Sequence, residues 1–193
     1  MVDKKGIGAV LVIAIVVIAV CMGAGAYLLL SRGGGPGGGA GAGGGAGESP
    51  ILTATSLSFK VTTTATVPEQ YRGTLDIKMK NIGKPNGKYR VDFWEEREGE
   101  NSYIIIIYDN SGPNLWQWTE WHGWEDLLSG VPIPDPLIQQ IISQYIVQYV
   151  EVLKNLGWVS GDVTYTDPST GRSVTISDIV VNPDLPDSLF QPS

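Results

Sequence analysis

Cysteine and histidine are almost absent from this chain, which has one of each among its 193 residues. A single Cys excludes an internal disulfide, and one Cys with one His cannot form a zinc site of the Cys/His type. A serine or cysteine hydrolase would have to use His122 as its only base. We therefore expect a binding or structural protein that is not an enzyme and that uses no metal and no cofactor.

Basic residues are also few. Thirteen Lys and Arg stand against 20 Asp and Glu, which gives a net charge of −7 at pH 7. A surface that binds nucleic acid needs an excess of positive charge to neutralise phosphates. Nucleic acid is therefore not an expected partner.

Charge is missing altogether from a long segment near the N-terminus. The 25 residues from Gly6 to Leu30 carry no charged side chain, and a helix of this length would cross a hydrocarbon core about 30 Å thick. Lys4 and Lys5 precede the segment and only Arg32 follows it closely, so the positive-inside rule places the N-terminus in the cytoplasm. The sequence predicts an uncleaved single-pass signal anchor in residues 1–32 and an extracytoplasmic location at the cell membrane for the rest.

Two other interpretations of this segment stay open. Lys-Lys-Gly before an apolar run resembles the leader of archaeal type IV pilins, which would be cut after Gly6. Residues 18–21 weakly resemble a lipobox, which would place a lipid on Cys21. Each interpretation leaves the remaining chain outside the cytoplasm at a membrane surface.

A glycine-rich segment follows, in which residues 33–47 contain eleven of the 25 Gly. Glycine loses the most backbone entropy on ordering and offers no side chain for a core. We expect a flexible linker that spans roughly 20 Å on average, and such a linker argues against a rigid pilin. Residues 48–193 then form one extracytoplasmic domain of ordinary size.

Apolar and polar residues alternate along several segments of this domain. The alternation is clearest in Leu57–Val67 and returns in residues 75–80 and 88–93, as is typical of antiparallel strands with one wet face. Ser102–Tyr108 reads SYIIIIY, which predicts a strand buried on both faces. With further strands in residues 114–119, 158–165 and 173–181, we expect about seven antiparallel strands in one curved sheet.

The pattern changes to helical spacing between Asp135 and Leu156. Asp135 is a plausible N-cap, Pro136 suits the first helical position, and Gly157 ends the run. Apolar residues recur every three or four positions, which predicts one long amphipathic helix. The expected fold class is α+β: a transmembrane helix, then a half-barrel sheet packed on this long helix. The tail of residues 182–193 has three prolines and is expected to run extended over the surface.

Three strings in this domain resemble the lipoprotein carrier family of outer-membrane lipoprotein sorting, including its archaeal relatives. They are residues 86–93 (NGKYRVDF), residues 104–118 and residues 167–193. The resemblance implies an incomplete antiparallel barrel closed by helices around an apolar cavity that holds acyl chains. The chain differs in lacking a clear helix before the first strand and in having a predicted anchor, so no individual ligand contact is carried over.

The leading hypothesis is a membrane-tethered domain that binds a lipid or a lipidated protein segment between sheet and helix. Its candidate cavity residues are apolar side chains of the predicted inner faces: Ile138, Ile141, Tyr145, Tyr149, Val152, Phe59, Val91, Phe93 and Trp116. Trp118, Trp121 and Trp124 are candidates for an aromatic rim, because Trp favours sites where one edge is wet. The alternatives are a pilin-like filament subunit and a surface module that contacts carbohydrate through the same three Trp. The oligomeric state is not indicated.

Overall fold

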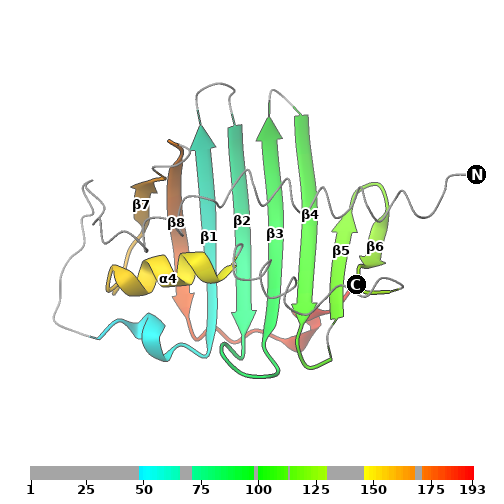
Figure 1. The fold of residues 1–193 in the computed structure, drawn as a ribbon, viewed down its shortest axis with the longest axis horizontal. Coiled ribbons are helices and arrows are strands. Elements are labelled where there is room, and N and C mark those ends of the chain that lie inside the picture. The colour runs from blue at the N-terminus through cyan, green and yellow to red at the C-terminus, as the bar shows by residue number, and fades with distance from the viewer. Residues whose placement is uncertain (1–47, 66–70, 98–99, 113, 130–145, 168–170) are drawn as a thin grey trace, which may run out of the picture.

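The computed structural model describes residues 48–65, 71–97, 100–112, 114–129, 146–167 and 171–193. They form one eight-stranded antiparallel sheet in the order β6-β5-β4-β3-β2-β1-β8-β7 (Figure 1). The strands are β1 (Ser56–Ala65), β2 (Tyr71–Lys80), β3 (Lys88–Arg97), β4 (Glu100–Asp109), β5 (Asn114–Thr119), β6 (Gly123–Asp126), β7 (Val163–Thr166) and β8 (Ser173–Val181). The helical elements are the short α-helix α4 (Gln148–Asn155) and the 3-10 turns η1 (Pro50–Thr53) and η3 (Asp187–Phe190).

The chain builds the sheet in two parts. Strands β1 to β6 form a meander in which each strand pairs with the one before it. After α4 the hairpin of β7 and β8 returns, and β8 pairs with β1 on the other side of the meander. The first strand therefore lies inside the sheet.

One face of the sheet, here called the front face, is covered by α4 on the side of β8, β1 and β2 (Figure 1). Leu153 of α4 is fully buried and belongs to one hydrophobic cluster with Leu57, Phe59 and Val61 of β1. Alternate residues of β2 and β3 continue this cluster, and Leu75, Ile77 and Val91 are each at most 5% exposed. Strand alternation therefore directs one set of apolar residues into the core beneath the helix.

The opposite face, here called the back face, has a second and smaller cluster. Phe190 of η3 is fully buried there with Ile105, Ile107 and Leu185. These four side chains bring the C-terminal tail, residues 182–193, across the back face. In Figure 1 the tail runs in red along the lower ends of the strands.

Polar contacts hold the same tail in place. Lys80 Nζ donates to the carbonyl oxygen of Leu185 at 2.7 Å and lies 2.9 Å from Asp187 Oδ1. Arg90 Nη1 donates to the carbonyl oxygen of Leu189 at 3.1 Å. The expectation of an extended surface tail is wrong in part: most of the tail is exposed, but Leu185 and Phe190 are buried, and residues 187–190 form a 3-10 turn.

The predicted fold class is wrong as well. The described chain is mostly an antiparallel sheet with a single short α-helix, and it is not an α+β fold built on a long amphipathic helix. Of the helix expected over Asp135–Leu156, α4 occupies only the C-terminal part, and residues 130–145 lie outside the described ranges. The short strand β6 was not expected.

The membrane location also needs correction. No helix in the described ranges is long and apolar enough to cross a bilayer. The predicted span Gly6–Leu30, with Cys21 inside it, and the glycine-rich residues 33–47 lie outside those ranges. The structure therefore provides no transmembrane helix in the part of the chain that it describes, and the single-pass membrane assignment is withdrawn.

Candidate functional site

Two aromatic side chains stack on the back face near the upper strand ends. Trp94 of β3 and Tyr103 of β4 lie directly opposite each other in the strand register. Their ring centroids are 4.9 Å apart and their planes differ by 14°. The Tyr103 ring also meets that of Trp118 in β5, at 5.5 Å and 56°. Trp94 is nevertheless 41% exposed, so this aromatic pair presents surface to solvent.

An open pocket of about 420 Å³ surrounds the pair. Its size falls in the range of small-molecule sites, which is about 300–1,000 Å³. The lining comes from the upper ends of β2, β3 and β4 and from the turn after β5: Arg72, Thr74, Trp94, Glu95, Glu96, Asn101, Ser102, Tyr103 and Glu120. An aromatic surface and a set of polar groups therefore converge on one space.

The polar groups of the pocket include one basic and three acidic side chains. Arg72 lies opposite Glu96 in the register of β2 and β3, and Glu96 lies opposite Asn101 in β4. The guanidinium offers up to five N–H donors, the carboxylates accept, and the Asn amide does both. The pocket can therefore exchange several hydrogen bonds with a polyhydroxylated ligand.

The hydroxyl group of Tyr103 is held by a hydrogen bond to a buried carboxylate. The hydroxyl donates to Asp92 Oδ1 at 3.1 Å, and Asp92 is only 4% exposed. Arg90 donates to the same carboxylate through Nη2 at 2.8 Å and through Nε at 2.9 Å. A phenol is neutral near pH 7 at its usual pKa of about 10, and burial and the neighbouring Asp92 raise the pKa of Tyr103 further. The aromatic pair thus has one ring held in place by a charged network.

The predicted cavity residues do not form one group. Phe59, Val91, Phe93 and Tyr149 are buried in the front-face cluster, and Val152 packs against it. Trp116 packs instead on the back face, beside the cluster of Ile107 and Phe190. Ile138, Ile141 and Tyr145 lie outside the described residues.

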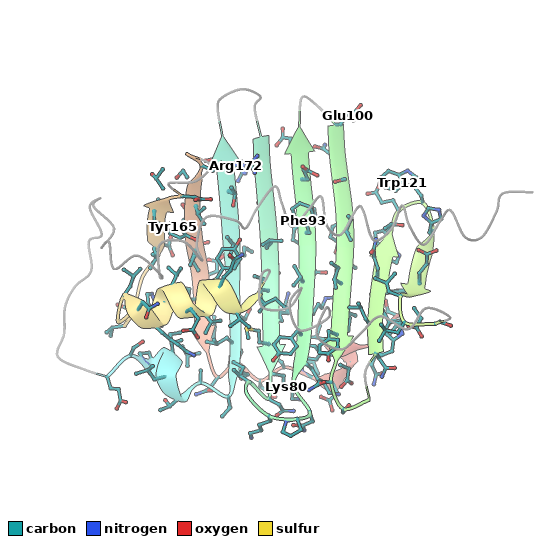
Figure 2. The ribbon with its side chains drawn as sticks, viewed as in Figure 1. Lys80, Phe93, Glu100, Trp121, Tyr165 and Arg172 are labelled. Atoms are coloured by element: carbon teal, nitrogen blue, oxygen red, sulfur yellow. The ribbon has the colours of Figure 1, made fainter. Side chains whose placement is uncertain are left out.

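The three Trp residues of the predicted aromatic rim do not lie together either. Trp118 lies opposite Trp124 in the register of β5 and β6, and both pack beside the back-face cluster. Trp121 is 72% exposed in the turn between these strands, at the upper edge of the sheet (Figure 2), and does not line the pocket. The neighbouring His122 has its Nδ1 3.5 Å from Thr119 Oγ1.

Sequence reasoning missed Trp94, Tyr103 and Arg72. A signal for Trp94 was present, since it continues the wet face of Lys88, Arg90 and Asp92 and is therefore an aromatic residue on a charged face. Its partner was not visible, because the register between two strands decides which residue it meets.

Within the described residues, no group of three or more His, Cys, Asp or Glu side chains is placed to hold a metal ion. Comparison with known protein families, with characterised proteins and with solved structures found no match to this chain. The resemblance to the lipoprotein carrier family stays a prediction.

Proposed function

We propose that this protein binds carbohydrate in the pocket around Trp94 and Tyr103. The proposal is carried by the stacked aromatic pair, of which Trp94 is 41% exposed, inside a pocket of about 420 Å³. An aromatic face is apolar and rigid, and it loses little conformational entropy on binding. The C–H faces of a sugar ring match such a surface.

The rest of the pocket suits the edges of a sugar ring. Hydroxyl groups around a pyranose both donate and accept hydrogen bonds. Arg72 can donate to them, Glu96 and Glu120 can accept, and Asn101 can do either. The wet, mixed lining therefore favours a polar ring over an acyl chain.

Glycan-array binding of the full-length chain tests this proposal. Trp94→Ala should weaken binding at least tenfold, because about 1.4 kcal/mol of lost contact corresponds to that factor. Trp94→Phe keeps a ring in the strand pair and should retain part of the affinity. The matched control is Trp121→Ala, which removes the same side chain from an exposed position that does not line the pocket.

Two results would contradict the proposal. One is a wild-type chain that binds no glycan on the array. The other is equal binding by wild type and a folded Trp94→Ala variant, which would leave the stacked pair as a cross-strand contact that stabilises β3 and β4.

Binding of a lipid or lipidated segment between sheet and helix stays a prediction. Phe59 and Tyr149, two of its candidate residues, already pack in one hydrophobic cluster. That packing accounts for their burial without a ligand, so the aromatic pocket is the better-supported site.

A further inference from the structure

The aromatic pair is one end of a longer row of side chains on the back face. Thr74 lies opposite Trp94 in β2, and Thr62 of β1 lies opposite Thr74. On its other side Thr62 lies opposite Thr175 of β8, and Thr175 lies opposite Thr164 of β7. The register thus places six residues in line across six strands: Thr164, Thr175, Thr62, Thr74, Trp94 and Tyr103. We call this set the hydroxyl–aromatic row.

The row is long and regular. Neighbouring strands are about 4.8 Å apart, so six positions span about 24 Å. At the β7 end of the row, Thr164 Oγ1 and Thr175 Oγ1 lie 3.0 Å apart, within hydrogen-bond distance of each other. The spacing of hydroxyl groups along the row is therefore set by the backbone ladder.

The threonine part of the row lies away from the C-terminal tail, whereas Tyr103 at the β4 end packs against the back-face cluster that holds Leu185 and Phe190. Figure 2 labels Arg172 and Glu100 at the upper strand ends and Lys80 at the lower ends, where the tail attaches. Thr175 lies three residues after Arg172, and Tyr103 lies three residues after Glu100. Both are therefore near the upper strand ends. Thr164 is exposed and Thr62 is half-buried, so the tail leaves these hydroxyl groups accessible.

Charge distinguishes the row from its neighbours. None of its six side chains is ionised near pH 7, whereas the next row toward the tail contains Lys60 and Asp76. In the next row on the other side, Thr64 lies opposite Arg72, and Arg72 lies opposite Glu96. A neutral strip of hydroxyl and aromatic groups gives no attraction to polyanions such as nucleic acids, and it offers donors and acceptors to a neutral polyhydroxylated chain.

We infer that the hydroxyl–aromatic row binds an extended, neutral polysaccharide laid across the strands. This inference rests on the proposed carbohydrate binding and deepens it. One sugar ring stacks on the face of Trp94 that Tyr103 leaves free, beside Thr74, and the following rings of the same chain lie over Thr62 and Thr175. The ligand is then a polymer of several linked rings, and affinity depends on its length.

The test compares linear neutral oligomers of two and six units, from the β-1,4-glucose, α-1,4-glucose and β-1,4-N-acetylglucosamine series, by calorimetry on the full-length chain. The six-unit oligomer of the preferred series should bind at least about tenfold more tightly than the two-unit one, or about 1.4 kcal/mol. The double variant Thr62→Val with Thr175→Val removes two hydroxyl groups and keeps β-branched side chains in the strands. It should lose the gain from length and keep the affinity for the two-unit oligomer. Thr53→Val is the matched control, because Thr53 is exposed in η1 away from the row.

The outcomes separate the two proposals. One outcome is that the chain binds array glycans through Trp94 but binds two-unit and six-unit oligomers equally well, or that the double variant binds like the wild type. That outcome overturns the inference about the hydroxyl–aromatic row and leaves the proposed function standing. A chain that binds no glycan on the array overturns both. If the ligand-free wild type sediments as a dimer and the double variant as a monomer, the row is a contact between two copies of this chain, and the inference is wrong.

Discussion

Replacing Phe190 by Ala measures how much the C-terminal tail contributes to the folded state. The Phe190 side chain is fully buried on the back face against Ile105, Ile107 and Leu185. Truncating a buried Phe to Ala costs about 3–5 kcal/mol, because transfer energy is lost and a cavity stays behind. Whole domains are stable by only about 5–15 kcal/mol, so this single change should remove a large share.

Urea unfolding followed by Trp fluorescence provides the measurement. We expect a loss of about 3–5 kcal/mol and a fall in Tm on the order of 10 °C. Leu52→Ala is the control, since Leu52 is also large and apolar but is 53% exposed, and it should change stability by less than about 0.5 kcal/mol. A loss below about 1 kcal/mol for Phe190→Ala would refute the reasoning. It would mean that the tail detaches easily and that the back-face cluster is not part of the cooperative core.

Three further changes probe the helix, its end and the acid limit of stability. Leu153→Ala should cost about 2–5 kcal/mol in the same unfolding assay, because Leu153 is fully buried between α4 and the sheet. A cost below about 1 kcal/mol would place α4 outside the core. Gly157→Ala should cost about 1 kcal/mol, because Gly157 has φ +59° at the end of α4 and a side chain is strained in that conformation. Among the described residues, no atom other than those of its chain neighbours lies within 4 Å of the added Cβ, so the variant measures backbone strain without a clash. An unchanged stability would contradict this prediction. Burial acts to raise the pKa of Asp109, but hydrogen bonds from Ser111 and the nearby Lys88 outweigh it and hold the pKa below its usual value. A lowered pKa in the folded state stabilises above the unfolded value of about 3.9, and this stabilisation disappears as pH falls through the folded pKa. Asp109→Asn should therefore destabilise the protein at pH 7 and much less at pH 2–3, and an equal loss at both would show that Asp109 is not the titrating group.

Alternation located most of the strands because it depends on local sequence. The pattern beginning at Leu57 corresponds to β1, and the run SYIIIIY corresponds to β4. Burial of β4 on both faces was also predictable, since Ile105 and Ile107 face the tail while Tyr108 joins the front-face cluster. A strand with one solvent-exposed face alternates apolar and polar residues, and a continuous β-branched run lacks that alternation.

Contacts between distant segments were not predictable in the same way. The three prolines of the tail predict an extended surface segment. Nothing in the tail sequence alone indicates that Leu185 and Phe190 pack into the back-face cluster. The four residues of β6 are too few for an alternating pattern. The aromatic pair of the candidate site depends on the register between β3 and β4, which the residues of either strand alone do not specify.

The return of β8 to the side of β1 has a consequence for synthesis of the chain. While β1 to β6 emerge from the ribosome, one edge of β1 has no partner, because residues 173–181 are made only after them. An open edge of ten residues invites pairing with another nascent chain. The ladder between the two strands joins positions more than 100 residues apart, and closing such a loop slows folding. The pairing of this edge of β1 therefore waits for β8, and until then the edge is open to pairing with other chains.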